Sequence, residues 1–507
     1  MRQPTLLHHL LDGAACTADR TALVAGSDSL TYGALREGVD TLAARLVRAG
    51  IEPGDRVAIL QPKSLAECVA IFAIGRAGAV FVPIHPSLRP RQVQHIVEDC
   101  GARALVTNAS LLAQLGAAIA FLSPAAITDS DAGLDPLIVR LDPTTTSAAP
   151  QDLAAILYTS GSTGLPKGVM LSHANLIAGI RIVRSYLGIT PDERILSVLP
   201  FAFDYGLNQL LTSVEQGACL VLLEFRFGDE VVRAIEEQGI TGLAGVPTLW
   251  TLLTRAAPRL ARADLSRLRY VTNSGGAVPL ETLARLRKAL PATEIVLMYG
   301  LTEAFRSTWL PPHEIAARPG SIGRAIPETE IFAVTEDGRR TRPGEPGILM
   351  HRGPTVSLGY WNRPEDTARV LVPDPRDPHA PPVCRSGDIV VEDEAGYFSF
   401  VGRADAMIKT AGFRVSPTEV EEALMETGAF RTVAIIGLPD ASVGQRIHAV
   451  AVLAEDGVPP DAALQAVRDL LPPHMVPRAV EAVAALPLTP NGKVDYKRLV
   501  AERTIDA

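Results

Sequence analysis

The sequence of 507 residues contains few cysteines, and they are arranged neither in pairs nor as metal ligands. Disulfide frameworks and structural zinc sites both need cysteines that are even in number or closely spaced, as in C-x-x-C. The five cysteines are odd in number and far apart: Cys16, Cys68, Cys100, Cys219 and Cys384. We therefore expect no disulfide framework and no zinc site, as in a protein of the reducing cytoplasm.

Long apolar runs and blocks of positive charge are also missing. No stretch approaches the roughly 20 apolar residues that span a bilayer. The first residues are too short a segment, and too interrupted by His8 and His9, for a signal peptide. The net charge is -8 and no Lys/Arg block occurs, which argues against nucleic acid and anionic membranes as partners. Small molecules or other proteins remain as the expected partners.

The chain is rich in apolar residues, at 47%, and longer than a single hydrophobic core usually allows, so we expect more than one domain. Short β-rich runs alternate with longer helical patterns, which is typical of parallel sheets covered by helices. The runs that we expect to be strands are 56–60, 79–83, 219–223 and 268–274, and the helical ones are 64–76 and 229–238. The turn 275–279 leads from the last strand into a helix whose first turn tolerates Pro279. The segment 128–151 has the composition of a surface connection.

Beyond Gly402 the pattern changes. It predicts helices at about 417–425 and 461–471, with paired strands near 432–436 and 448–453. We interpret this part as a small α+β domain. No repeat of about 20 to 50 residues is evident, which sets solenoid folds aside.

The most informative stretch is 157–168, where hydroxyl and glycine residues precede a single lysine. Glycine lets successive backbone N–H groups converge on an anion, hydroxyls add donors, and lysine adds a mobile cation. The pattern does not match the Walker sequence, because Lys167 follows Pro166 and precedes Gly168. Composition alone leaves a flexible loop as an equal alternative. The candidate ATP-phosphate ligands are Thr159, Ser160, Gly161, Ser162, Thr163, Gly164 and Lys167.

Together with 169–176, this stretch closely resembles the phosphate-binding signature of the adenylate-forming (AMP-binding) superfamily. That superfamily includes acyl-CoA synthetases, luciferases and peptide-synthetase adenylation domains. The resemblance spans essentially the whole chain and implies an α/β fold: a large N-terminal domain with mixed and parallel sheets covered by helices, and a small mobile α+β C-terminal domain. It implies a core that binds ATP and the acid at 1–404 and a small domain with the catalytic lysine at 405–507.

Two further segments resemble nucleotide-site motifs of the family. In 299–303, Tyr299 would lie on adenine beside Gly300, and Thr302 and Glu303 would face the phosphates, with Glu303 as a magnesium ligand. Magnesium is often bound by one or two carboxylates plus nucleotide phosphates. Without context, a strand-ending turn with a capping threonine is the simpler interpretation. In 274–277, Gly276 would contact the nucleotide.

The other motifs concern the ribose and the small domain. Arg385 to Asp388 resembles a T-G-D element with serine for threonine, and implies that Asp388 accepts hydrogen bonds from the ribose hydroxyls. The segment 402–414 resembles the hinge motif, with Arg403 near ribose, Asp405 as the pivot and the loop around Gly412 used for thiolation. An exposed hairpin is the alternative for this segment.

Near the end, 489–495 resembles the family's terminal lysine motif. Lys493 would stand on a turn made by Asn491 and Gly492 and contact both the substrate carboxylate and the α-phosphate. Without this context, a lysine after Asn-Gly usually lies exposed to solvent on a hairpin turn. Because a carboxylate must approach an anionic phosphate, magnesium, Lys167 and Lys493 would act by neutralising charge.

The segment 201–209 bears on the identity of the acid, because amino-acid-activating members of the family carry Phe-Asp at this position. Phe203 and Asp204 would line the pocket, and a substrate ammonium would satisfy the Asp204 carboxylate. The alternative is that Asp204 acts as a helix N-cap, and both roles can hold together. Ser274 and Gly275 are further pocket candidates. Arg306 would face the far end of the acid or simply form a surface ion pair.

The leading hypothesis is a stand-alone enzyme that adenylates an amino acid, including β-amino acids, with release of pyrophosphate. We expect transfer of the acyl group to the phosphopantetheine thiol of a separate acyl carrier protein. The alternative is a coenzyme A ligase for a fatty or aryl acid. A degenerate nucleotide-binding regulator is disfavoured by the joint presence of all the motifs, and no residue demands the oxygen chemistry of a luciferase.

Overall fold

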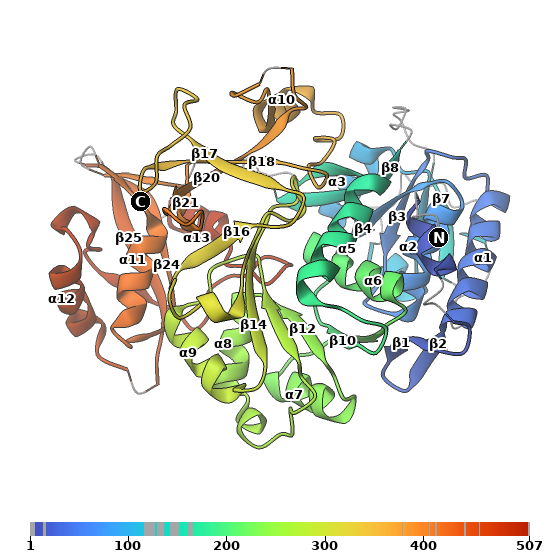
Figure 1. The fold of residues 1–507 in the computed structure, drawn as a ribbon, viewed down its shortest axis with the longest axis horizontal. Helices are drawn as coiled ribbons and strands as arrows, with labels where there is room; N and C mark the ends of the chain where they lie inside the picture. Colours follow the sequence, from blue (N-terminus) through green and yellow to red (C-terminus); the bar gives the residue numbers. More distant parts are fainter. Residues whose placement is uncertain are drawn as a thin grey trace.

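The computed structural model describes residues 6–13, 17–115, 127–128, 136–141, 152–160, 166–377, 379–404, 406–410, 413–440, 443–455 and 457–504. It contains three sheets (Figure 1). Two sheets belong to the large N-terminal part, and the third lies at the opposite end of the molecule from the N-terminus. None of the described helices combines the length and apolarity needed to cross a membrane.

The first sheet has the strand order β6-β7-β5-β3-β4-β8-β9. Its strands are β3 (Arg56–Leu60), β4 (Val80–Ile84), β5 (Ala104–Thr107), β6 (Ile127–Thr128), β7 (Leu137–Arg140), β8 (Leu153–Ser160) and β9 (Pro166–Ser172). The central pairs β5/β3, β3/β4 and β4/β8 are parallel. Every residue of β3, β4 and β5 is buried, as expected for parallel strands covered on both faces.

The second sheet has 14 strands, in the order β17-β18-β20-β21-β16-β15-β14-β13-β12-β10-β11-β1-β2, with β19 paired to β20. The strands from β14 to β1 are parallel, and the rest pair in antiparallel fashion. Their bounds are β1 (Thr21–Ala25), β2 (Asp28–Thr31), β10 (Arg194–Ser197), β11 (Cys219–Leu222), β12 (Gly242–Gly245), β13 (Tyr270–Asn273), β14 (Glu294–Tyr299), β15 (Thr308–Leu310), β16 (Ser321–Ala325), β17 (Glu330–Val334), β18 (Pro346–Arg352), β19 (Leu371–Val372), β20 (Val383–Glu392) and β21 (Phe398–Arg403).

The third sheet forms the small C-terminal domain, in the order β23-β22-β25-β24, with β26 parallel to β25. Its strands are β22 (Ile408–Thr410), β23 (Phe413–Val415), β24 (Phe430–Asp440), β25 (Gly444–Leu453) and β26 (Val480–Ala482). The change of sheet thus falls between β21 and β22. The proposed pivot Asp405 and the loop residue Gly412 lie outside the described residues, so the boundary at 404/405 stays a prediction.

Helices cover the sheets, and two of them lie between the first and second sheets (Figure 1). There α5 contacts β8 and β9, α6 contacts β10 and β11, and the two helices contact each other. The helices are α1 (Tyr32–Arg48), α2 (Leu65–Arg76), α3 (Pro90–Cys100), α4 (Ala109–Leu115), α5 (His173–Leu187), α6 (Asp204–Gln216), α7 (Gly228–Glu237), α8 (Pro247–Ala256), α9 (Leu280–Ala289), α10 (Pro364–Val370), α11 (Pro417–Glu426), α12 (Pro460–Leu470) and α13 (Tyr496–Thr504). Short 3₁₀ turns add η1 (Leu7–Asp12), η4 (Pro258–Ala261), η5 (Pro312–Glu314) and η6 (Pro473–Met475).

The expected fold class is confirmed, with two local corrections. The segment 128–151 is not only a surface connection, because 137–140 form β7, which pairs with β5 and has three buried residues. The remainder of that segment, apart from 136, 141 and Thr128 in β6, lies outside the described residues. Pro279 is the N-cap residue of α9 and does not stand inside its first turn.

Candidate functional site

The predicted phosphate loop connects β8 and β9, which form an antiparallel hairpin. Thr159 pairs with Lys167 in the register of the two strands. The Lys167 ammonium lies 2.9 Å from a carboxylate oxygen of Asp366, in the first turn of α10, and this hydrogen bond holds the pKa of Asp366 below its usual range. The loop residues Gly161, Ser162, Thr163 and Gly164 and the side chain of Ser160 lie outside the described part. Their predicted contacts with phosphate stay predictions.

The 299–303 motif begins at the last residue of β14. The Tyr299 hydroxyl donates a hydrogen bond to the Asp388 carboxylate, and burial together with this carboxylate raises the pKa of Tyr299. The buried ring of His351 stacks on Tyr299, with 6.2 Å between ring centroids. Beyond Gly300, the Glu303 carboxylate accepts a hydrogen bond of 2.5 Å from the Tyr360 hydroxyl. Tyr360 therefore orients the residue that the sequence predicts as a magnesium ligand.

The T-G-D-like element places its carboxylate beside the same tyrosine. Ser386 donates to the Leu349 carbonyl oxygen at 2.8 Å and accepts from the backbone N–H of Asp388 at 3.0 Å. The Ser386 hydroxyl thus holds the backbone of β20 next to Gly387, which has φ +74°. Arg403 lies 3.1 Å from the Asp388 carboxylate and is half exposed. Asp388, Arg403 and Tyr299 are therefore brought together, as the sequence predicts.

The terminal lysine stands at the tip of a hairpin that reaches the large domain. Thr489 and Lys493 exchange hydrogen bonds, and Gly492 has φ +75°, which favours glycine. The Thr248 hydroxyl, in α8, donates a hydrogen bond of 2.9 Å to the Gly492 carbonyl oxygen. This contact ties the hairpin of the small domain to the large one.

The side chain of Lys493 lies against the turn that follows β13. Its ammonium is 5.1 Å from the centre of the Phe203 ring. A Cβ added at Gly275, which has φ +86°, would stand 2.9 Å from Cε of Lys493. Side-chain space at Gly275 is therefore taken by the lysine. Ser274 is buried next to this turn, and the Gly276 carbonyl accepts a hydrogen bond from Asn273.

The charge around Lys493 is mixed. Burial lowers the pKa of Lys493, and three nearby carboxylates oppose this effect, those of Asp204, Asp388 and Glu303. The terminal lysine thus lies near carboxylates from three motifs that are far apart in the sequence. This geometry joins the two domains in one site.

Asp204 forms an ion pair with Arg306 inside the large domain. Their side chains are 5% and 2% exposed, and the Arg306 Nη1 lies 3.1 Å from the Asp204 Oδ2. Thr302 donates to the other Asp204 oxygen at 3.5 Å, the long limit for a hydrogen bond. The guanidinium also lies over the Tyr205 ring, 4.7 Å from its centre. Its Nε and Nη2 are buried and have no hydrogen-bond partner among the described residues.

Two alternatives from the sequence are therefore wrong. Arg306 does not form a surface ion pair, because it is 1% exposed. Asp204 is not the N-cap of α6, because Phe203 occupies that position and no side chain caps the helix. The sequence interpretation considered Asp204 and Arg306 separately and did not anticipate that they bind each other.

Three contributors were missed by sequence reasoning: Tyr360, Asp366 and Thr248. Tyr360 binds Glu303 and Asp366 binds Lys167, which are predicted site residues, and Thr248 binds Gly492 in the turn next to Lys493. Tyr360 follows Gly359, and the segment 359–361 bonds to β9, which carries Lys167. A glycine–aromatic pair is a weak signal in one sequence, and a single threonine or aspartate gives none.

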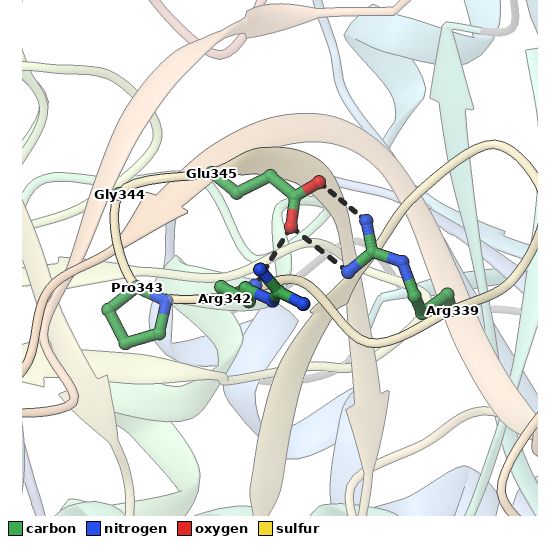
Figure 2. A pocket seen from close by; sticks show the side chains of 5 residues that line it. All are labelled: Arg339, Arg342, Pro343, Gly344 and Glu345. Carbon is green, nitrogen blue, oxygen red and sulfur yellow. Dashed lines mark hydrogen bonds and ion pairs between the residues drawn. The ribbon is translucent and has the colours of Figure 1, made fainter.

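A separate surface pocket of about 530 Å³ lies at the loop that connects β17 to β18 (Figure 2). It is lined by Arg339, Arg342, Pro343, Gly344 and Glu345, none of which belongs to a predicted motif. Glu345 binds the Arg339 guanidinium and the backbone N–H of Arg342. The charged groups that line this pocket therefore bind one another, and the pocket is not part of the site around Lys493.

Among the described residues, no group of three or more His, Cys, Asp or Glu side chains could hold a metal by itself. Glu303, in the 299–303 motif, stays the predicted magnesium ligand.

Comparison with known proteins identifies two matching family models. The AMP-binding enzyme model matches residues 11–361, and the AMP-binding enzyme C-terminal domain model matches 419–493. The feruloyl-CoA synthase of Amycolatopsis sp is 36% identical over 94% of this chain and 94% of its own length. A linear gramicidin synthase of Brevibacillus parabrevis is 32% identical over 96% of this chain, which spans only 6% of that protein.

Two solved structures share the fold over nearly the whole chain. ATP-bound MatB from Rhodopseudomonas palustris is 27% identical, with a TM-score of 0.86 and coverage of 99% of both chains. The amide bond synthetase McbA from Marinactinospora thermotolerans is 28% identical, with a TM-score of 0.86, over 98% of this chain and 100% of its own.

Proposed function

The chain belongs to the AMP-binding enzyme family and is an adenylate-forming ligase, and from this premise we propose how it uses the site around Lys493. In the first half-reaction, an oxygen of the acid carboxylate attacks the α-phosphorus of ATP. The bond from that phosphorus to the bridging oxygen breaks, and pyrophosphate leaves with the electron pair. The single observation that supports this proposal best is the position of Lys493, held by the Thr248–Gly492 hydrogen bond against Gly275 and Phe203.

The charges of the site suit this step. Two anions must approach each other, and a cation that faces both lowers the barrier by neutralising charge. We assign this role to Lys493, with Lys167 at the phosphates and Glu303 as a ligand of magnesium. A bound magnesium ion would neutralise phosphate charge. Tyr299, Asp388 and Arg403 would bind the nucleoside.

In the second half-reaction, a phosphopantetheine thiol attacks the acyl carbon, a C–S bond forms, the thiol proton is lost, and AMP leaves. The thiol would belong to a separate carrier protein or to coenzyme A. We propose that, before the thiol attacks, the small domain turns about Asp405, withdraws Lys493 and brings the loop around Gly412 to the site. Relatives of both kinds support the thiol acceptor, since they include a feruloyl-CoA synthase and a gramicidin synthase.

For the acid, the ion pair between Asp204 and Arg306 favours a substrate without an ammonium group. The guanidinium already neutralises the buried carboxylate, so a second cation beside it would be repelled. The unpaired Nε–H and Nη2–H of Arg306 favour an acid that carries hydrogen-bond acceptors. The best-supported activity is therefore that of a ligase for a non-amino acid, as in the sequence-based alternative, but on an acid that carries polar groups and not on a plain fatty acid.

Activation of an amino acid, including β-amino acids, is the second candidate. It is favoured by Asp204 Oδ1, which accepts only the 3.5 Å hydrogen bond from Thr302 among its described contacts and could bind an ammonium more tightly. An ammonium at that oxygen would have to tolerate the neighbouring Arg306.

Acid-dependent exchange of pyrophosphate into ATP tests both candidates. A panel would contain α- and β-amino acids, fatty acids, aryl acids, and hydroxy or oxo acids. We expect exchange with the hydroxy or oxo acids, which carry hydrogen-bond acceptors. Strong exchange with amino acids would instead support the second candidate, activation of an amino acid. Formation of ADP and orthophosphate in place of AMP and pyrophosphate would overturn the proposal. Addition of coenzyme A or a phosphopantetheinylated carrier protein then identifies the acceptor by the thioester formed.

A variant pair tests the role of the terminal lysine. Lys493→Ala should slow exchange by about 10²- to 10³-fold, as is common on loss of a group that stabilises developing charge. ATP binding, measured at equilibrium, should change little. The matched control is Lys497→Ala, an exposed lysine four residues further along. Equal exchange rates in the two variants would remove Lys493 from the mechanism.

A further inference from the structure

Lys63 connects the first sheet to the segment that leads to the acid pocket. It lies just beyond β3, immediately before the N-cap residue Ser64 of α2. Its ammonium donates hydrogen bonds to the Ser197 hydroxyl at 3.1 Å and to the Leu199 carbonyl oxygen at 2.5 Å. It also lies over the fully buried Phe201 ring, 3.9 Å from the ring centre. All three contacts are in the second sheet or in the connection that follows β10.

Two acidic residues, Glu67 and Glu224, lie near this ammonium. Glu67, in the first turn of α2, is 6% exposed, and the Lys63 backbone N–H donates to a Glu224 carboxylate oxygen at 3.1 Å. Burial raises the pKa of Glu67 to about 8, and the Lys63 charge opposes that shift. Burial also lowers the pKa of Lys63. Hydrogen bonds from a partly buried cation are stronger than those at a surface.

The contacts of Lys63 fall on one short connection, 198–203, between β10 and α6, and on the last residue of β10. The start of α6 packs against the same backbone, since a Cβ at Gly206 would stand 2.2 Å from the Pro200 carbonyl oxygen. The last residue of the connection, Phe203, is the one whose ring faces the Lys493 ammonium. Asp204 follows it directly. A shift of this connection would therefore move the acid-side residues relative to the terminal lysine.

We propose that Lys63 is a positioning residue for acid recognition: by holding Ser197, Leu199 and Phe201 from the neighbouring sheet, it fixes Phe203 and Asp204 beneath Lys493. This inference rests on the proposed function for the role of the acid site. It assigns Lys63 no contact with the reacting atoms.

The test compares Lys63→Met with the wild type in the exchange assay. The methionine keeps the length of the side chain but removes the charge and the donors. We expect the KM for the acid to rise by about tenfold, because small displacements of positioned groups are costly, with the KM for ATP changed by less than about twofold. Ser197→Ala removes one of the contacts and should raise the acid KM by a smaller factor. Lys288→Met, at an exposed position of α9, is the matched control and should leave both constants unchanged.

A purely structural role would change both KM values together or neither, and that result would overturn the inference. If Lys63→Met fails to fold, Ser197→Ala provides the test, again by a rise in the KM for the acid without a matching rise in the KM for ATP. Hydrogen exchange gives an independent readout, because the amides of 198–203 should exchange faster in either variant than in the wild type, whereas those of β3 should not. If no acid supports pyrophosphate exchange in the wild type, the proposed function is contradicted. If the amide hydrogen exchange of 198–203 is unchanged in the variants, only the role of Lys63 is contradicted.

Discussion

Asp204 and Arg306 are each expensive to bury alone, and together they form one neutral unit inside the large domain. A carboxylate or a guanidinium taken out of water loses its hydration, and this cost is offset only where a partner of opposite charge and hydrogen bonds replace the water. Here the compensation is a 3.1 Å ion pair between side chains that are almost fully buried. The pair therefore couples the stability of the large domain to the electrostatics of its pocket.

We expect Asp204→Leu to lower the free energy of unfolding by about 3 to 5 kcal/mol, because it leaves the Arg306 charge buried without its partner. The double variant Asp204→Leu/Arg306→Met should recover most of this loss, since two apolar side chains can replace a buried ion pair at little cost. Urea denaturation followed by circular dichroism measures both. As a control, Glu502→Ala breaks the exposed pair with Arg498 and should cost less than about 1 kcal/mol. A double variant as unstable as the single one would show that the pair is not the reason for the loss.

At this scale the sequence predicts chemical types better than partners. Serine in Arg385 to Asp388 keeps the hydroxyl of the T-G-D element, and the Ser386 hydroxyl binds the Leu349 carbonyl oxygen and the backbone N–H of Asp388. The ion pair between Asp204 and Arg306 depends on how α6 and the connection between β14 and β15 approach each other, because the two residues are 102 positions apart in the chain. No local pattern contains that information. The roles of the individual site residues in binding and catalysis stay predictions.

Among the elements, the hairpin that carries Lys493 has the clearest connection to function. It is closed by the hydrogen bonds between Thr489 and Lys493, and a hydrogen bond to Thr248 of α8 holds it on the large domain. A neutral hydrogen bond contributes about 0.5 to 1.5 kcal/mol. Its loss should weaken the docked position of the small domain without unfolding either domain.

We therefore expect Thr248→Val, which keeps the shape of the side chain, to slow pyrophosphate exchange by about two- to tenfold. Transfer of the acyl group from a pre-formed acyl-adenylate to the thiol should not slow, because the proposed second half-reaction needs the hairpin withdrawn. Rapid-quench measurements of the two half-reactions check this. Thr254→Val, in the same helix, is the control, because its hydroxyl bonds only within α8. Equal slowing of both half-reactions would contradict separate positions of the small domain.

The sequence predicts secondary structure well where one local pattern dominates. The strand 56–60 and the helix 64–76 match β3 and α2 to within a residue, because an unbroken apolar run precedes a serine cap. The paired strands of the small domain are observed as β24 and β25. The strand β7 was missed, because four apolar or basic residues between polar segments give little signal until β5 is there to pair with them.

On the scale of the whole molecule, buried ionisable groups make stability depend on pH. Burial lowers the pKa of His8 to about 4 and that of His351 to about 3, both from 6.5. The folded chain therefore binds fewer protons at these histidines than the unfolded chain below pH 6.5. The stability contributed by each neutral histidine is complete above that pH and is lost as the pH falls toward the folded pKa. Burial raises the pKa of Glu67 to about 8 and that of Glu421 to about 7, which acts in the opposite sense.

His351 allows one of these contributions to be isolated, because its imidazole is fully buried and neither ring nitrogen has a hydrogen-bond partner among the described residues. Between pH 7 and pH 5, its share of the lost stability should be about 2 kcal/mol. We expect His351→Leu to shrink the fall in unfolding free energy over this range by that amount. It should also be at least as stable as the wild type at pH 7, since it removes two unpaired polar atoms. His313→Leu, at an exposed position, is the control and should leave the pH dependence unchanged. If urea titrations give His351→Leu the same pH dependence as the wild type, the neutral buried imidazole is not a source of acid sensitivity.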